Sequence, residues 1–313
     1  MGKSQGKDIV ITLGDPSGCG PEITFRAINS LTDKKINFWV VGDKYIAERI
    51  PEYQKVKKRI FFLDNALPGI KDIKRGIASK LSGQASLSYL KKALELIKKE
   101  KFNYLVTAPV SKEAIGLVQP GFSGHTEFLR DYFRRKRVVM MMFSDKIRTV
   151  LLTRHICLKD VAMSINKKLV LDTLNLTYSF LKERLSIENP VIGFASPNPH
   201  AGVDTFMEKE EKTIKAAIDQ FQGKVYGPYP ADSLFTKDNL KKFDCIVSSY
   251  HDQAMIPFKL LSFRSGINLT LGLPIIRTSP GHGVAYELVR NNPQAIFSSS
   301  MEAAISQIIS LDL

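Results

Sequence analysis

The sequence predicts an α/β protein with a mostly parallel sheet and helices on both faces. Short apolar runs rich in β-branched and aromatic residues alternate with longer segments in which apolar residues recur at every third or fourth position. The residues directly after these runs are polar or glycine. Ligands in open α/β sheets bind beyond the carboxyl ends of the strands, so this placement indicates a ligand site at one sheet edge.

The first third of the chain contains four predicted strands. They lie at 8–14, 37–43, 59–64 and 104–109. A helix begins near Pro21, because proline suits the first helical position. Another helix follows the second strand, and a long helix spans 83–100, where leucine, alanine and isoleucine recur at helical spacing.

The remainder of the chain continues the alternation. Apolar runs predict strands at 137–144, 148–153, 190–196, 245–250 and 267–276. Helices are expected near 167–187, 207–222, 283–290 and 299–310. In the stretch "SGHTEF", Ser123 or Thr126 is a candidate N-cap for a further helix. We expect two interleaved lobes with a central cleft, bounded at about 1–135 plus 265–313 and at about 136–264.

Composition excludes several classes of protein. No apolar run reaches the ~20 residues of a membrane span, and the N-terminus lacks a signal peptide's apolar region, so a cytoplasmic protein without membrane contact is expected. The 3 cysteines form no CxxC pair, which argues against a disulfide framework or a cysteine zinc site. The net charge of +14 is scattered and its basic clusters carry no nucleic-acid motif, so no nucleic-acid partner is expected.

Three of the 5 histidines directly follow predicted strands. These are His155, His200 and His251. A single histidine at a strand end is more often a hydrogen-bonded structural residue than a ligand. Three on neighbouring strands would face one site, and imidazole is a common ligand of Zn²⁺ and similar ions. Asp252, next to His251 in "YHDQAMIPFK", would then balance charge or orient a ligand.

The loop "GDPSGCGPEI" lies between the first strand and the first helix. Gly18 and Gly20 permit unusual backbone angles, so the loop is either an anion cradle or an ordinary strand-to-helix turn. It matches neither GxGxxG nor GxxxxGK[ST].

Cations late in the chain indicate an anionic substrate. Lys259 follows the histidine loop, and Arg277 ends the apolar run that contains Asn268. Cleft-lining cations within apolar sequence need phosphate or carboxylate partners. The alternative is that both cations lie on the surface at strand ends.

A set of ordered motifs gives the chain a family resemblance. The motifs are "GDPSGCGPEI", "TAPVSKEAI", "GHTEFL", "NPHAG", "GPYPADSLF", "YHDQ" and "INLTLGLPIIRTS". With these, the chain resembles the 4-hydroxythreonine-4-phosphate dehydrogenase (PdxA) family of pyridoxal phosphate biosynthesis over nearly its whole length. The resemblance implies an α/β/α fold of the isocitrate/isopropylmalate dehydrogenase type, with 1–135 plus 265–313 on the cofactor side and 136–264 on the metal and dimer side.

The resemblance also implies residue roles in a homodimer with shared active sites. His155, His200 and His251 would bind one divalent metal ion, Zn, Mg or Co, with one of them expected from the partner chain. Further residues match the family's substrate-binding positions: His125, Thr126, Lys259, Asn268 and Arg277. The chain departs from the usual pattern at Arg154, where a threonine is common, and at "SPGHG", which lacks the usual acid before His282.

The implied reaction is NAD-dependent oxidation of the secondary alcohol of 4-phosphooxy-L-threonine, a phosphorylated hydroxy-amino acid. The product, 2-amino-3-oxo-4-phosphooxybutanoate, would lose CO₂ to give 3-amino-2-oxopropyl phosphate. A metal ion at the hydroxyl would stabilise the developing alkoxide. Lys112, Asp232 and Asp252 are candidates for the base, and the sequence does not choose among them.

The stretch "GHGVAYEL" is similar to a loop that wraps the adenosine in isocitrate and isopropylmalate dehydrogenases. This similarity implies a cofactor site at His282, Gly283 and Glu287. A carboxylate accepts hydrogen bonds from the ribose hydroxyls of NAD and repels the 2′-phosphate of NADP, so we expect NAD to be preferred, with NADP as the alternative. On the other interpretation, Glu287 is a solvated helix residue.

Two other functions stay open. A paralogue of the same fold would oxidise a threonate or erythronate phosphate, or a dihydrodiol carboxylate. A three-histidine metal site near cations would also suit a metal-dependent phosphate-ester hydrolase, which would release phosphate without a change in nicotinamide absorbance.

Overall fold

The computed structural model describes residues 6–32, 36–202 and 209–311, which form two compact units. Unit 1 consists of Met1–Arg134 and Leu273–Ser310, and unit 2 consists of Arg135–Gly272 and Leu311–Leu313. Two segments that are far apart in the sequence therefore build unit 1, whereas unit 2 is almost continuous.

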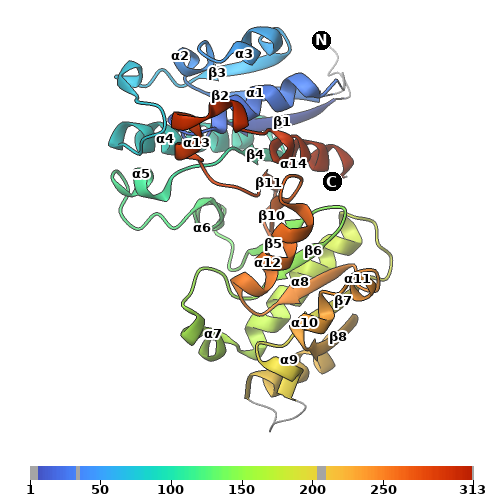
Figure 1. The fold of residues 1–313 in the computed structure, drawn as a ribbon. Coiled ribbons are helices and arrows are strands. Elements are labelled where there is room, and N and C mark those ends of the chain that lie inside the picture. The colour runs from blue at the N-terminus through green and yellow to red at the C-terminus, as the bar shows by residue number, and fades with distance from the viewer. Residues whose placement is uncertain (1–5, 33–35, 203–208, 312–313) are drawn as a thin grey trace. The chain divides into compact units, whose positions relative to one another are not determined.

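Unit 1 contains a parallel sheet with the strand order β3-β2-β1-β4-β11 (Figure 1). The strands are β1 Lys7–Thr12, β2 Ile36–Gly42, β3 Ile60–Asp64, β4 Tyr104–Thr107 and β11 Ile276–Pro280. Strands β4 and β11 are buried along their whole length, as expected for parallel strands that are covered on both faces.

Helices cover both faces of the unit 1 sheet. They are α1 Gly20–Ser30, α2 Lys44–Ala47, α3 Pro51–Val56, η1 Ile70–Asp72, α4 Lys80–Glu100, α5 Lys112–Gly116, α6 His125–Tyr132, α13 Tyr286–Asn291, η3 Pro293–Ala295 and α14 Ser299–Ser310. The chain runs from β1 to β3 in one direction and returns past β1 to β4, so right-handed crossovers place α1 and α4 on opposite faces. Helix α1 packs against α3 and α14, whereas α4 packs on β1 and β2 and against α5.

Unit 2 contains strands in the order β10-β5-β6-β9-β7-β8. They are β5 Val139–Phe143, β6 Arg148–Leu151, β7 Val191–Ala195, β8 Lys224–Tyr229, β9 Cys245–Ser248 and β10 Ile267–Leu271. Strand β5 is antiparallel to both β6 and β10, and the pairs β6–β9, β9–β7 and β7–β8 are parallel. The sheet is thus mostly parallel, as predicted, with one reversed strand.

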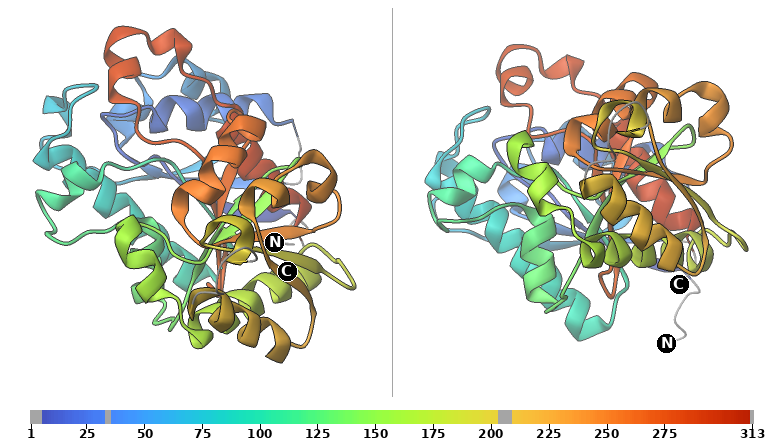
Figure 2. Two further views of the ribbon diagram at one scale, coloured as in Figure 1. Left: turned by 60° about the horizontal axis from the view of Figure 1, so that its bottom comes forward. Right: turned by 90° about the horizontal axis from the view of Figure 1, so that it is seen from below.

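Unit 2 also contains helices, several of which pack directly on the strands of this sheet (Figure 2). They are α7 Leu158–Ser164, α8 Lys167–Glu183, η2 Pro199–Gly202, α9 Lys209–Gln220, α10 Ala231–Leu234, α11 Lys237–Leu240 and α12 His251–Ser262. Helix α12 packs on β6 and β9 through Ala254 and Phe258, which join a core cluster with Met140, Met142 and Leu151. Among the described residues, no helix combines the length and apolar composition needed to cross a membrane.

The α/β fold predicted from the sequence is confirmed, and two strand and helix boundaries are corrected. The apolar run 267–276 is not one strand, because Gly272 turns the chain with a φ of 89° between β10 and β11. The helix expected near 283–290 begins only at Tyr286, because Ala285 has a left-handed φ of 52°.

The predicted cap of the helix in "SGHTEF" is also wrong. Neither Ser123 nor Thr126 caps α6. The N-cap is Gly124, whose φ of 139° is one that residues with a side chain rarely adopt.

Candidate functional site

Three neighbouring parallel strands of unit 2 each lead into a loop or helix that carries a histidine. Strand β9 lies between β6 and β7. His155 follows β6, His251 follows β9 and His200 follows β7. Because the carboxyl ends of parallel strands meet at one edge, the three histidines belong to the same edge of the unit 2 sheet.

His155 and His251 lie side by side, with ring centroids 5.7 Å apart. Nδ1 of His251 lies 2.7 Å from Oδ1 of Asp252, which leaves its Nε2 available to a metal ion. Two imidazoles that bind one tetrahedral Zn²⁺ at about 2.0–2.1 Å would have centroids about 5 Å apart. The observed spacing therefore fits two ligands of one metal ion.

His200 differs from the other two histidines. It lies in η2, where His200 and Ala201 have left-handed φ angles of 55° and 51°. Among the described residues, no group of three His, Cys, Asp or Glu side chains is arranged to hold a metal ion. The structure thus pairs His155 with His251 and does not place His200 in a common ligand group with them.

Hydrogen bonds tie the three histidine loops together. The amide oxygen of Gln253 accepts from the Ser249 backbone N–H at 2.7 Å, and its amide nitrogen donates to the Ser196 carbonyl at 2.8 Å. The Thr153 hydroxyl donates to the Ser249 carbonyl at 2.6 Å. Gln253 of the "YHDQ" motif therefore links the loop after β9 to the loop after β7, and Thr153 links it to the loop after β6.

A buried carboxylate, Glu211 of α9, anchors the loop that carries His200. Glu211 has no solvent-exposed surface. Its Oε1 accepts from the Ser196 hydroxyl at 2.6 Å, and its two oxygens accept from the Asn198 side-chain amide at 2.9 and 3.2 Å. Glu211 thus determines the path of the chain between β7 and His200.

Arg277 is the centre of a buried polar group in unit 1. Its side chain is only 2% exposed, and Nε and Nη2 donate to the Thr107 hydroxyl at 3.1 and 2.6 Å. Burial lowers the pKa of Arg277 to about 10, and the Glu127 carboxylate opposes that shift. The alternative that Arg277 is a surface cation at a strand end is therefore wrong: it lies inside β11.

His125 and Thr126 are the first two residues of α6, and His125 lies close to the charge of Arg277. Burial, and then the positive charge of Arg277, hold the pKa of His125 well below its usual range. Its Nε2 is buried and makes no hydrogen bond to any described residue. Lys112 lies close to Gly124, the residue before His125, because a Cβ placed on Gly124 would be 3.3 Å from Cε of Lys112. The group offers a neutral imidazole and cations to an anionic ligand.

The remaining predicted substrate and base residues lie in unit 2. Lys259 is exposed on α12 and Asp232 is exposed in the first turn of α10. Asn268 lies on β10, and its side-chain Oδ1 is buried without a hydrogen bond to any described residue. An unused buried acceptor suits a ligand that donates a hydrogen bond, such as a hydroxyl or ammonium group.

The predicted cofactor residues lie around the loop between β11 and α13 in unit 1. The ring of His282 packs against Phe297, and its Nδ1 lies 3.0 Å from the Gly283 carbonyl, to which it must donate. Burial lowers the pKa of His282, and its Nε2 is buried with no hydrogen bond to a described residue. A neutral imidazole with an unused acceptor fits a hydroxyl or amino group of a nucleotide. Glu287 is exposed.

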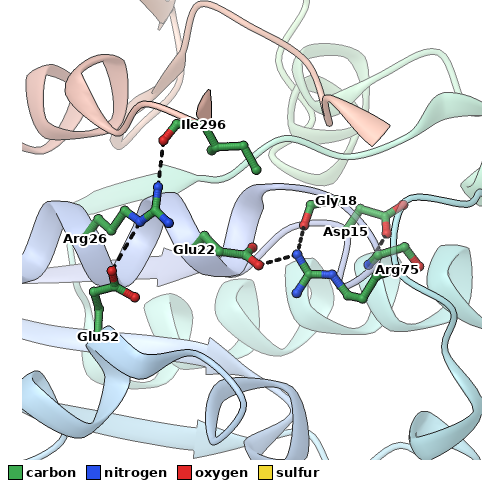
Figure 3. A network of polar contacts seen from close by, with 8 residues as sticks. Asp15, Gly18, Glu22, Arg26, Glu52, Arg75 and Ile296 are labelled. Atoms are coloured by element: carbon green, nitrogen blue, oxygen red, sulfur yellow. Dashed lines mark hydrogen bonds and ion pairs between the residues drawn. The ribbon is translucent and has the colours of Figure 1, made fainter. Parts of the chain in front are cut away.

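The turn "GDPSGCGPEI" after β1 is tied down by its own hydrogen bonds (Figure 3). The backbone N–H of Ser17 donates to the Asp15 carboxylate and that of Gly18 to the Asp15 carbonyl. The side chain of Arg75 donates to the Gly18 carbonyl and pairs with Glu22. The turn amides of Ser17 and Gly18 are therefore committed within the protein, which favours an ordinary strand-to-helix turn over an anion cradle.

A family comparison decides the identity of the chain. Residues 22–308 match the family described as pyridoxal phosphate biosynthetic protein PdxA. The chain belongs to the PdxA family. A 4-hydroxythreonine-4-phosphate dehydrogenase from Desulforapulum autotrophicum is 36% identical over 96% of both chains. A D-threonate 4-phosphate dehydrogenase from Salmonella typhimurium is 31% identical over 90% of this chain and 92% of that one.

A solved PdxA-type structure has the same fold. The 4-hydroxythreonine-4-phosphate dehydrogenase from Klebsiella pneumoniae superposes with a TM-score of 0.82 at 27% identity, over 97% of this chain and 99% of that one. The resemblance to the PdxA family and the prediction of an oxidoreductase are confirmed. The roles of individual residues stay predictions.

Proposed function

We propose that this PdxA-family protein is the NAD-dependent, metal-dependent dehydrogenase that oxidises 4-phosphooxy-L-threonine to 2-amino-3-oxo-4-phosphooxybutanoate. That product then decarboxylates to 3-amino-2-oxopropyl phosphate. The observation that carries the proposal is the likeness, over 96% of both chains, to the D. autotrophicum enzyme of that name. We also propose that the enzyme acts in the cytoplasm.

The histidine edge of unit 2 supports metal dependence. His155 and His251 have the spacing of two ligands, and His200 on the same edge is the proposed third. A bound Zn²⁺, Mg²⁺ or Co²⁺ would act as a Lewis acid on the substrate hydroxyl. Asp252 holds the His251 ring through Nδ1, which fixes the tautomer that presents Nε2. Asp252 is therefore better suited to orient His251 than to serve as the base.

The buried polar group of unit 1 supports an anionic substrate. Arg277 supplies a charge with fixed orientation, and a guanidinium can bind phosphate or carboxylate with two hydrogen bonds. Burial and the charge of Arg277 hold His125 neutral, and a neutral imidazole with its proton on Nε2 donates a hydrogen bond to an anionic oxygen without adding charge. Thr126 completes the substrate residues proposed in unit 1, and Lys112 stays the base candidate there.

Unit 2 supplies the other proposed substrate residues. The unused Oδ1 of Asn268 suits a donor such as the ammonium group of a hydroxy-amino acid. Lys259 provides a second cation. Asp232 is exposed in α10 and remains a candidate base.

The loop that carries His282 and Gly283 supports a nicotinamide dinucleotide cofactor. The neutral His282 presents an unused acceptor to an adenosine hydroxyl or amine. Glu287 stands exposed at the second residue of α13, where its carboxylate would disfavour the 2′-phosphate of NADP. We therefore propose NAD as the preferred cofactor, with NADP as the weaker one.

Two observations favour a second candidate substrate, a threonate phosphate. The S. typhimurium relative of that name covers most of the chain. In addition, burial lowers the pKa of Arg137 and the charge of Arg154, next to His155, lowers it further, whereas the Asp172 carboxylate opposes the shift. Two neighbouring guanidinium groups favour a more anionic ligand. Threonate phosphate is more anionic than 4-phosphooxy-L-threonine because it lacks the ammonium group.

A substrate panel tests the proposal. The metal-loaded protein is incubated with NAD and either 4-phosphooxy-L-threonine, D-threonate 4-phosphate or D-erythronate 4-phosphate, and reduced nicotinamide is followed by absorbance. We expect the highest kcat/KM for 4-phosphooxy-L-threonine. A higher value for threonate phosphate would establish the second candidate. Release of inorganic phosphate without reduction of NAD would refute both and indicate a hydrolase. His251→Ala is the inactive control.

We further propose a homodimer with shared active sites. Near the histidine edge, unit 2 exposes apolar side chains that an isolated chain has no reason to present to water. They are Met163, Leu260, Leu158, Ile256 and Phe263, which are 60–88% exposed. They lie on α7 and at α12, directly after His155 and His251 in the chain.

Complementation tests the shared sites. Inactive His155→Ala, His200→Ala and His251→Ala chains are mixed in pairs, including the His155/His251 pair, under conditions that allow subunit exchange. If one ligand comes from the partner chain, at least one pair should regain activity, and a pair that fails identifies two ligands of the same chain. Failure of every pair, with heterodimers demonstrated, would place all three ligands on one chain.

A further inference from the structure

The proposed cofactor loop, residues 281–285, joins β11 to α13 without helix or strand hydrogen bonds of its own. Its position must therefore come from contacts with other segments. In unit 1 those contacts come mainly from the turn after β1, the "GDPSGCGPEI" motif, to which no role has yet been assigned.

Backbone contacts join the turn to the loop. The backbone N–H of Cys19 donates to the Val284 carbonyl at 2.9 Å, and its thiol lies 3.5 Å from the Gly283 carbonyl. A Cβ on Gly18 would lie 2.9 Å from the same Val284 oxygen. Gly18 therefore permits the loop to approach the turn as closely as it does, and a larger residue would push it away.

A side-chain hydrogen bond closes the end of the loop. The hydroxyl of Tyr286, the first residue of α13, donates to Oδ2 of Asp15 at 2.6 Å. Asp15 is completely buried, and its other oxygen accepts from the Ser17 backbone N–H at 2.7 Å. The Ser82 hydroxyl of α4 lies 3.5 Å from Oδ2. The carboxylate thus joins the turn, α4 and the start of α13.

The segment around Gly76 contacts both the turn and the start of α13. Its backbone N–H donates to the Ser17 carbonyl at 2.7 Å. A Cβ on Gly76 would lie 2.8 Å from the Tyr286 carbonyl. The start of α13 is therefore enclosed by packed backbone, and the Tyr286 hydroxyl is the side-chain group that fixes it to the turn.

We propose that Asp15 and Tyr286 form a latch that holds residues 281–286 in the shape that binds the adenosine part of the dinucleotide. Tyr286 is a positioning residue that acts through His282 and Gly283. The role of the latch in nucleotide binding rests on the proposed function, whereas the latch itself does not. The "GDPSGCGPEI" turn thereby serves the cofactor as a support and not as a phosphate cradle.

The first test uses the metal-loaded protein without nucleotide and measures backbone hydrogen exchange. Tyr286→Phe removes the hydroxyl and keeps the ring. We expect amide exchange in 283–289, and at Cys19, to rise about tenfold, because a hydrogen bond to a buried carboxylate is lost. Tyr53→Phe is the matched control, since its ring packs between Phe25 and Phe62 far from the turn in the chain. Unchanged exchange in Tyr286→Phe would overturn the latch.

The second test measures the dissociation constant of NADH by its fluorescence in the absence of substrate. We expect Tyr286→Phe and Asp15→Asn each to weaken binding about tenfold, and the double variant to bind no more weakly than the weaker single variant. Metal content and substrate KM should not change. Additive losses in the double variant, or faster exchange with unchanged NADH affinity, would overturn the assigned role. Failure of the wild type to bind NADH or NADPH would refute the cofactor assignment itself.

Discussion

Replacement of Glu211 should destabilise unit 2 more than that of almost any other acidic residue, because this buried carboxylate accepts hydrogen bonds from both Ser196 and Asn198. In Glu211→Ala both donors lose their partner inside the protein. A buried unsatisfied donor costs about 1–3 kcal/mol, and because Ser196 is buried while Asn198 is only half-buried, the free energy of unfolding should fall by about 2–4 kcal/mol. In Glu211→Gln the Asn198 amide can turn its oxygen toward the new amide, so the loss should be about 1–2 kcal/mol.

Urea unfolding followed by far-UV circular dichroism measures this loss. The single tryptophan of the chain, Trp39, lies in β2 and reports on unit 1 by its fluorescence. The variants should therefore shift the dichroism transition more than the fluorescence transition. Glu210→Gln, at the neighbouring and less buried position of α9, is the control. A shift below about 1 kcal/mol in Glu211→Ala, or an equal shift in Glu210→Gln, would refute the anchoring role.

Three further outcomes are expected. His155→Ala should lose most of the bound divalent metal, measured by atomic emission after dialysis, and keep its circular dichroism spectrum; full metal retention would exclude His155 as a ligand. Glu287→Lys should shift the ratio of kcat/KM toward NADP by about tenfold or more, and an unchanged ratio would show that Glu287 does not read the ribose. Burial lowers the pKa of His125 in the folded state, so below about pH 6.5 the unfolded chain binds a proton that the folded chain does not. The free energy of unfolding should therefore decrease as the pH is lowered. Between about pH 6.5 and pH 5 this loss should be up to about 2 kcal/mol larger in the wild type than in His125→Asn, as measured by urea unfolding at each pH; equal pH dependence would contradict the shift.

The parts of the site that repeat with the strand pattern could be predicted from the sequence. His155, His200 and His251 follow apolar runs, and neighbouring parallel strands bring such positions to one edge. The neighbouring residues His251 and Asp252 left three roles open for Asp252, namely charge balance, orientation of His251 and the base. The 2.7 Å contact between Nδ1 of His251 and Oδ1 of Asp252 favours the second role, which stays a prediction. The pattern could not predict the pairing of His155 with His251 or the separate position of His200. The strand order and the left-handed φ angles at His200 and Ala201 are not encoded in the local apolar pattern.

Contacts between segments that are distant in the sequence were the main features that the sequence did not predict. Asp15 and Tyr286 are 271 positions apart, and only the fold brings them together. Asp15 belongs to the "GDPSGCGPEI" motif, and an acid directly after a buried strand is a signal that could have indicated a buried, hydrogen-bonded carboxylate. Glu211 gave no signal, because it lies in a charged segment where neighbouring acids are solvated. The burial of Arg277 agrees with the expectation of a cation within apolar sequence, but its place inside a separate strand was missed, because Gly272 divides an apolar run that the sequence presents as continuous.

The division of unit 1 into two segments has a consequence during synthesis on the ribosome. Strands β1 to β4 emerge first, but β11, which pairs with β4, and α14, which packs on β11 and α1, emerge only after the segment Arg135–Gly272 of unit 2. At about 5–20 residues per second, the ribosome needs roughly seven to twenty-eight seconds to make the segment Arg135–Gly272. During that interval one edge of β4 has no strand beside it, and unpaired strand edges promote association with other chains. The nascent chain therefore passes through a stage in which the whole segment Arg135–Gly272 of unit 2 is present and unit 1 is incomplete, and a chaperone that covers the β4 edge would act at that stage.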